Sequence, residues 1–183
     1  KANRPFHKIY NMFSASDIYR NTQKEDAAYQ TLKTALAESR KLNDQSLVKS
    51  CINNLILVCI DLEQWEEATQ WYQEYQKNNS RNYPTVAFYG YIARLHAKNK
   101  NFKDAFMLLN ETWKKTKSLQ DSINLFHAES QVHQMNGSWE ESYRSMAKSI
   151  SHQNKVIRKS LQQPVLTAQN NFLNKELELQ KYK

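Results

Sequence analysis

Histidines are the side chains of this sequence best suited to holding a metal or moving a proton. Two of them, His96 and His133, stand 37 residues apart. A zinc site needs further ligands at about 2 Å from the ion, and no spacing in the sequence supplies them. We therefore interpret these two imidazoles as packed side chains and expect no metal. The full set is His7, His96, His127, His133 and His152.

Nucleophiles and acid–base pairs offer no better basis for catalysis. Cys51 and Cys59 would lie about 12 Å apart along one helix, which is too far for a disulfide, so both are expected to be buried and unpaired. Paired glutamates open two predicted helices, where an acid in the first turn stabilises the helix dipole. The sequence has no Gly-rich loop, nucleophile elbow, Cys-x-x-Cys or His-Glu-x-x-His. It therefore predicts a non-catalytic protein without a cofactor.

The composition indicates helices and a packed core. Of the 183 residues, 40% are hydrophobic, while only 2 are Gly and 3 are Pro. Few turn residues and many helix formers argue against a β-rich fold. No apolar run approaches the roughly 20 residues that cross a bilayer. The formal net charge of +8 would suit nucleic acid, but the basic residues are dispersed, and we interpret most of them as a solvated surface.

One pattern recurs at equal steps along the chain. An aromatic residue, Trp65, Phe102 or Trp139, precedes a charged residue, an acid and a small residue. Both steps between these aromatic residues are 37 residues. The small residue allows two helices to approach closely, and a bulky side chain one turn later fills the groove beside it. A period of this length predicts a helical solenoid, with Trp65 and Trp139 packed in the core. A weaker copy precedes it around Ala28.

These residues resemble the tetratricopeptide repeat family. The resemblance rests on the small-plus-bulky pairs Ala68/Tyr72 and Ala105/Leu109, and on Tyr89, Ile92 and Ala93. It implies an all-α, right-handed superhelix of about four tetratricopeptide-like hairpins plus a C-terminal helix. The expected hairpins are 9–48, 49–85, 86–122 and 123–159 within an array spanning 1–159, and residues 160–183 form a capping or connecting helix. The period of 37 differs from the family's repeat of about 34, and the usual closing proline is missing.

The same resemblance implies a binding face. First helices of such hairpins line a concave groove, and a polar, amide-rich groove can hydrogen-bond an extended peptide or accept a helix. Family members that bind chaperone carboxyl termini use a lysine- and asparagine-rich clamp, whereas here Ala87, Gly90 and Tyr91 occupy positions where basic groups would help. That ligand is therefore not expected. The residues projected onto the face are Asn53, Asn54, Leu57, Tyr91, Arg94, His127, Gln131 and Gln134.

The last twenty residues predict a helix that Pro164 starts or kinks. Val165, Ala168, Phe172 and Leu179 line one stripe of it. Its charged last turns, KELELQKYK, resemble the helix that leads out of the repeat domain in bacterial membrane-tethered regulators.

Taken together, the sequence predicts a non-catalytic scaffold that binds a protein or peptide as the sensor or interaction region of a larger bacterial signalling protein. An extracytoplasmic, periplasmic location is favoured by that resemblance and by a chain that begins at Lys1 rather than Met; a membrane span would then flank these residues. A free-standing cytosolic adaptor is the alternative. A nucleic-acid-binding repeat protein is a third, disfavoured reading.

Overall fold

The structure is a computed structural model that describes residues 4–80 and 84–181. Within these residues every regular element is an α-helix, so the all-α prediction is confirmed. The predicted ranges also include residues 1–3, 81–83 and 182–183, which lie outside the described residues. The helices are α1 (Arg4–Asn21), α2 (Glu25–Lys41), α3 (Gln45–Asp61), α4 (Trp65–Lys77), α5 (Val86–Lys98), α6 (Phe102–Trp113), α7 (Leu119–Met135) and α8 (Trp139–Lys181).

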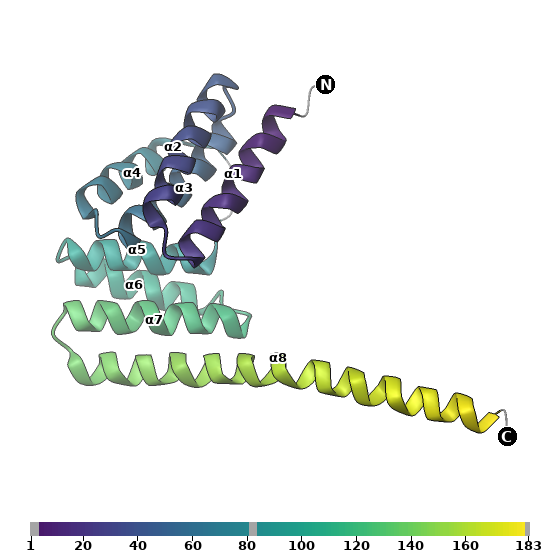
Figure 1. The fold of residues 1–183 in the computed structure, drawn as a ribbon. Helices are drawn as coiled ribbons and strands as arrows, with labels where there is room; N and C mark the ends of the chain where they lie inside the picture. The colour runs from purple at the N-terminus through teal and green to yellow at the C-terminus, as the bar shows by residue number, and fades with distance from the viewer. Residues whose placement is uncertain (1–3, 81–83, 182–183) are drawn as a thin grey trace.

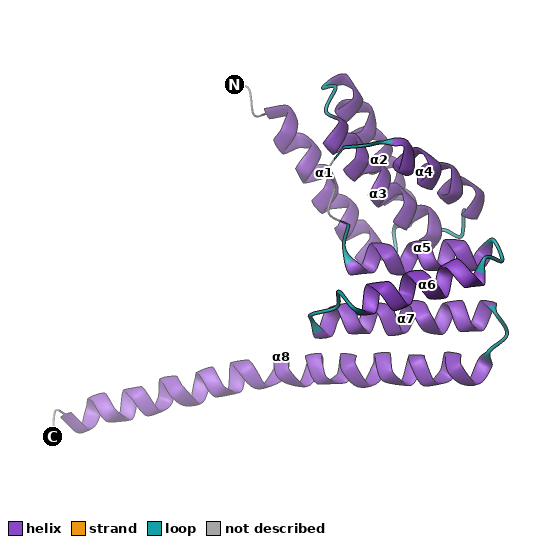
Figure 2. Cartoon of the chain, turned by 180° about the vertical axis from the view of Figure 1, so that it is seen from behind, coloured by secondary structure: helices purple, strands orange, loops and turns teal. Residues whose placement is uncertain are grey.

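The helices pack sequentially, each against its neighbour along the chain. Helices α5 to α8 lie one below another, and α1 to α4 form a tilted group above them (Figures 1 and 2). The first helices of successive pairs also touch, α3 with α5 and α5 with α7. This arrangement is compatible with a helical repeat of four pairs, whereas the handedness of its path stays a prediction. Helix α3 begins before the predicted boundary at residue 49, because Asp44 caps it by accepting from the backbone N–H groups of Ser46 and Leu47 at 3.0 Å.

The turns inside the four pairs share one backbone geometry. Each contains one residue with positive φ, between 56° at Gln23 and 77° at Gly137. In each turn, the N–H of the following residue donates to a carbonyl five positions back, as from Gln64 to Cys59 at 2.8 Å and from Asn101 to His96 at 2.9 Å. This pattern closes a helix by satisfying its last carbonyls. The turn residues are Gln23, Glu63, Lys100 and Gly137, and the last three repeat the 37-residue step.

Small residues bring the helices of each pair together as predicted. Ala28, Ala68 and Ala105 are fully buried, and all three stand at the start of a second helix. The matching Ser142 on α8 is half-buried, and its hydroxyl lies 3.1 Å from that of Ser130 on α7. The close approach inferred from the repeat is therefore present in all four pairs.

The predicted roles of the histidines and cysteines in packing are confirmed where the repeat specifies them. The ring of His96 packs edge-on against Tyr72 at 5.9 Å between centroids, and His133 packs against Phe106 at 4.8 Å. Both cysteines are buried and unpaired on α3. Burial raises the pKa of the Cys59 thiol to about 12, so this thiol stays protonated and unreactive at neutral pH.

The predicted packing of the repeated aromatic residue is wrong at the last pair. Trp65 is half-buried, but Trp139 is 67% exposed. The difference arises because a further pair covers the second helices α4 and α6, whereas no described helix follows α8.

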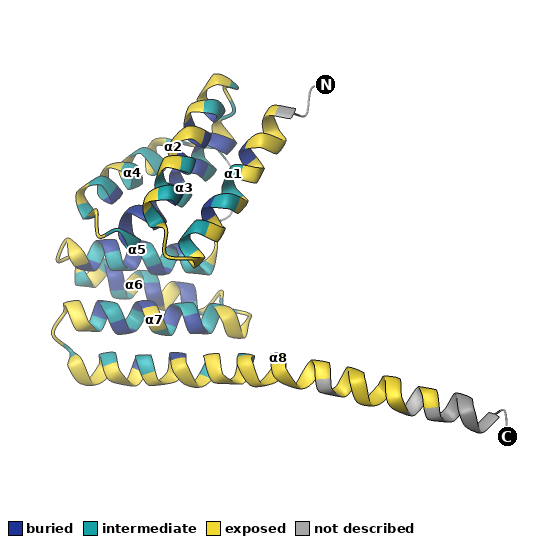
Figure 3. Cartoon of the chain, in the orientation of Figure 1, coloured by how far each residue is buried: buried dark blue, intermediate teal, exposed yellow. Residues whose placement is uncertain are grey.

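Helix α8 also differs from the prediction at Pro164. It runs unbroken for 43 residues with Pro164 inside it, so residues 160–183 do not begin a separate helix. Helix α7 packs against the first half of α8, and the second half projects away from the body (Figures 1 and 3). The described side chains from Ser160 to Phe172 are exposed, so residues 139–156 cover α7 in place of the expected capping segment. The side chains of Val165 and Leu179 lie outside the described residues.

Candidate binding pocket on the first helices

A pocket of about 340 Å³ opens on the side of the molecule formed by the first helices of the pairs. Its walls come from the end of α1, from α3, and along much of α5 and α7. We call it the first-helix pocket. It is lined by Arg20, Asn21, Leu57, Ala87, Gly90, Tyr91, Arg94, Asn124, His127, Ala128 and Gln131.

Five of the eight residues that the sequence projected onto the binding face meet in this pocket; they are Leu57, Tyr91, Arg94, His127 and Gln131. The other three lie outside it. Asn53 and Asn54 are half-buried further back along α3, where the Asn54 amide donates to the Ser50 carbonyl at 3.1 Å. Gln134 is exposed near the end of α7. Whether the face binds a ligand stays a prediction.

Gly90 explains why α5 and α7 converge on the pocket. A Cβ atom added at Gly90 would lie 3.0 Å from the Cβ of Ala128, closer than ordinary van der Waals contact. The missing side chain therefore lets the two helices approach closely. Tyr91 and Arg94 follow on α5, and His127 and Gln131 flank Ala128 on α7, so the four side chains reach the same pocket.

An ion pair that the sequence did not reveal holds α1 against this pocket. Arg20 donates to the carboxylate of Asp61 at 2.7 and 3.0 Å, and to the hydroxyl of Tyr91 at 2.9 Å. Both charged side chains are largely buried, at 18% and 22% exposure. Arg20 and Asp61 are 41 residues apart, which does not match the repeat step, so no pattern connects them. The pair fixes the position of the Tyr91 ring.

Arg94 is the second cation of the pocket, and unlike Arg20 it forms no ion pair with a described carboxylate. Its guanidinium carbon lies 5.0 Å from the centre of the Tyr91 ring and 6.0 Å from that of Trp65. Its Nε is buried and has no hydrogen-bond partner among the described residues. Burial lowers the pKa of Arg94, yet a guanidinium stays charged in proteins. The Tyr91 oxygen and the negative charges of Asp61 and Glu63 already act on this guanidinium, so the Nε is the charged donor that Arg94 leaves unpartnered.

Two neighbours on α7 complete the polar part of the pocket. Burial, and then the nearby charge of Arg94, lower the pKa of His127, so its imidazole is neutral at pH 7. The Oε1 of Gln131 is buried and accepts no hydrogen bond within the described residues. A buried polar atom without a partner costs about 1–3 kcal/mol, and a ligand donor would remove that cost.

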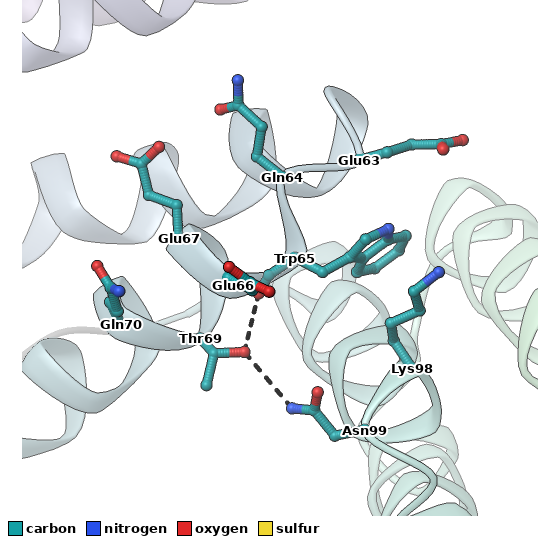
Figure 4. Close-up of a pocket in the computed structure, with 9 residues that line it drawn as sticks. All are labelled: Glu63, Gln64, Trp65, Glu66, Glu67, Thr69, Gln70, Lys98 and Asn99. Atoms are coloured by element: carbon teal, nitrogen blue, oxygen red, sulfur yellow. Dashed lines mark hydrogen bonds between the residues drawn. The ribbon is translucent and has the colours of Figure 1, made fainter.

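A larger, more open hollow of about 990 Å³ lies at the turn between α3 and α4. Figure 4 shows its lining, where Thr69 donates to the carbonyl of Trp65 at 2.9 Å and accepts from Asn99 at 3.4 Å. The Nζ of Lys98 lies 5.1 Å from the Trp65 ring. Glu67 accepts hydrogen bonds from Tyr29 and Trp71. Because these polar groups already make hydrogen bonds or cation–π contacts with one another, the first-helix pocket is the stronger candidate site.

Among the described residues, no three His, Cys, Asp or Glu side chains come together as metal ligands do. None of the described helices combines the length and apolar character of a membrane span. A scan against protein-family models finds no match to this chain, and a search of curated proteins finds no matching protein.

Proposed function

We propose that this chain is a non-catalytic recognition unit of the tetratricopeptide type and that its first-helix pocket binds an acidic segment of a protein or peptide. The observation that carries the proposal is Arg94, a guanidinium with a buried, unpartnered donor inside a pocket. Guanidinium groups bind carboxylates through paired, charge-assisted hydrogen bonds.

The other groups of the pocket suit a peptide better than an isolated anion. The Oε1 of Gln131 can accept from a backbone N–H, and Asn21 and Asn124 add further amides at the rim. Tyr91 supplies an aromatic surface, held in place by Arg20. A pocket that combines one cation, several amides and an aromatic ring matches the mixed backbone and side-chain groups of an extended peptide.

Two biological settings fit such a unit. In the first, the chain is the sensor or interaction region of a larger bacterial regulatory protein, tethered through the helix that continues α8. In the second, it is a free-standing adaptor. The net charge of +8 supports the alternative of a nucleic-acid-binding protein. That alternative requires the affinity for nucleic acid to fall steeply as the salt concentration rises.

A selection from a random peptide library displayed on phage tests the proposal. The wild-type protein is expected to enrich peptides that share an Asp or Glu. The Arg94→Gln variant keeps the size and polarity of the side chain but removes its charge, and it is expected to lose at least tenfold in affinity for the selected peptides.

Arg158→Gln is the matched control, because Arg158 is an exposed arginine on the projecting part of α8. It removes the same charge from the protein at a site far along the chain from the pocket. Equal affinity of the selected peptides for the wild type and Arg94→Gln would overturn the proposal, as would a selection without any acidic preference.

A further inference from the structure

Helix α8 carries an apolar stripe that nothing in the described chain covers. Its members are separated by four, seven or eleven residues, which places them on one face of the helix. At 1.5 Å per residue the stripe is about 50 Å long. Its residues, all 49% exposed or more, are Trp139, Tyr143, Ile150, Ile157, Leu161 and Phe172.

The preceding pair shows what covers these positions elsewhere in the repeat. One repeat step of 37 residues earlier on α6, Tyr143 corresponds to Phe106, and Ile150 corresponds to Trp113. Phe106 packs against His133 of α7, and Trp113 packs against Phe126 of α7 at 4.6 Å between ring centroids. The indole N–H of Trp113 also donates to Glu129. The corresponding Tyr143 and Ile150 on α8 are 76% and 50% exposed.

The covering helix runs antiparallel to the helix it covers. As the residue number rises from Phe106 to Trp113 on α6, the contacted residue falls from His133 to Phe126 on α7. Because the stripe on α8 occupies the equivalent positions, we expect it to pack against an antiparallel helix.

We infer that the occupant is the α8 helix of a second copy of this chain, which pairs with its own α8 in an antiparallel manner. Placing Ile150 opposite the partner's Leu161 brings Tyr143 opposite the partner's Ala168 and Trp139 opposite the partner's Phe172. The match arises because the same steps of four and seven residues run in opposite directions along the two helices. Ile157, the remaining member of the stripe, falls opposite the partner's Asn154. Each projecting tail then covers the exposed end of the other copy's body.

The distribution of charge permits this self-pairing. From Ser142 to Asn174 the helix has no acidic residue, and its basic residues are Arg144, Lys148, Lys155, Arg158 and Lys159. None of them belongs to the stripe, and by helical spacing Lys148, Lys155 and Lys159 lie on the opposite side of α8. Pairing therefore buries apolar surface without burying a charge of the stripe itself. The basic residues of the two helices repel one another, so the dimer is expected to strengthen as salt screens that repulsion. Pro164, which lacks an N–H group, falls opposite the partner's small Ala147.

This α8 dimer does not involve the first-helix pocket, so it is independent of peptide binding. It does bear on which of the two biological settings applies. It sends the two C-terminal tails in opposite directions, which favours a free-standing adaptor over a chain tethered through the continuation of α8.

Sedimentation equilibrium of the 183-residue chain over a range of concentrations tests the pairing. The wild type is expected to form a dimer, and Leu161→Glu is expected to weaken the dimer at least tenfold. Leu166→Glu is the matched control, because Leu166 is similarly exposed, at 57% against 67%, but lies on the opposite side of the same helix. A monomeric wild type, or equal effects of the two substitutions, would overturn the inference.

Disulfide trapping tests the direction of pairing. Mixing an Ile150→Cys chain with a Leu161→Cys chain is expected to give a cross-linked heterodimer on oxidation, while each variant alone does not cross-link. The native Cys51 and Cys59 are buried and do not compete. Efficient cross-linking of Leu161→Cys with itself would show parallel pairing and contradict the proposed arrangement.

Discussion

At the scale of single residues, the Arg20–Asp61 pair organises the wall of the pocket. Replacing Asp61 with Asn leaves the largely buried Arg20 without its counter-charge, and we expect the free energy of unfolding to fall by about 2 kcal/mol. Urea denaturation monitored by circular dichroism measures the change.

The Arg40–Glu74 pair provides the control, since the two atoms are also 2.7 Å apart but the side chains are 52% and 41% exposed. Glu74→Gln is expected to cost no more than about 0.5 kcal/mol, because water screens an exposed pair. Similar losses in the two variants would show that Asp61 does not have the structural role assigned to it.

His127 is expected to give peptide binding a dependence on pH. Its pKa is lowered by burial and by Arg94, so the free protein carries a neutral imidazole above the ordinary histidine pKa of about 6.5. An acidic peptide favours the protonated form, and binding should therefore take up a proton. Affinity for an acidic peptide is expected to rise several-fold between pH 7.5 and pH 5.5.

Isothermal titration calorimetry at several pH values checks this, with His127→Gln as the control. The substitution keeps a polar side chain without a titrating group in this range, so it should flatten the pH profile. A profile that is unchanged by the substitution would assign the dependence to another group.

Sequence reasoning found the members of the pocket that the repeat specifies. The helical spacing of the first helices predicted four of them: Tyr91, Arg94, His127 and Gln131. The repeat step also predicted the packed rings of His96 and His133. Arg20, Asp61 and Asn124 were missed. The contact of Arg20 with Asp61 depends on the angle between α1 and α3, and periodicity along one helix carries no information about that angle.

At the scale of elements, the repeated turn is the clearest feature that the sequence and the structure share. Gly137 adopts positive φ without steric cost, whereas Lys100 holds the same conformation against the repulsion of its Cβ. Gly137→Ala is therefore expected to lower the free energy of unfolding by about 1 kcal/mol. Lys100→Gly at the equivalent turn is expected to raise it by about 0.5 kcal/mol.

Chemical denaturation of both variants measures these opposite shifts. Nothing lies within 4 Å of a Cβ built at Gly137, so a loss there reports backbone conformation rather than a clash. Shifts of the same sign would contradict the equivalence of the two turns.

The ends of the helices were predicted less well than their existence. The turns at Glu63, Lys100 and Gly137 keep the 37-residue step, because each lies two residues before the repeated aromatic residue. The start of α3 and the continuation of α8 through Pro164 were not predicted. A proline inside a helix removes one hydrogen bond and leaves the carbonyl four residues earlier without its usual donor, which is costly where that carbonyl is buried. Here the surrounding residues are exposed, and water can satisfy that carbonyl.

At the scale of the whole molecule, the body and the projecting half of α8 are expected to be separable. The described side chains from Ser160 to Phe172 are exposed, so they add little to the stability of the monomer. A chain that ends after Lys159 should unfold with the same free energy as the dilute wild type, within about 0.5 kcal/mol. It should also remain monomeric at concentrations where the full chain pairs.

Thermal and urea unfolding at low protein concentration, together with sedimentation, check both halves of this prediction. A large loss of monomer stability would show that the projecting half folds back onto the body. A truncated chain that still dimerises would place the interface elsewhere.

The measurement that tests the central claim most directly is a double-mutant cycle between Arg94 and the acidic residue of a selected peptide. Calorimetry gives the dissociation constants of wild type and Arg94→Gln, each with the acidic peptide and its amide counterpart. A direct contact in the first-helix pocket predicts a coupling free energy of about 1.5 kcal/mol or more. A coupling free energy of zero would contradict the account, because the acid would then bind at a site that Arg94 does not form.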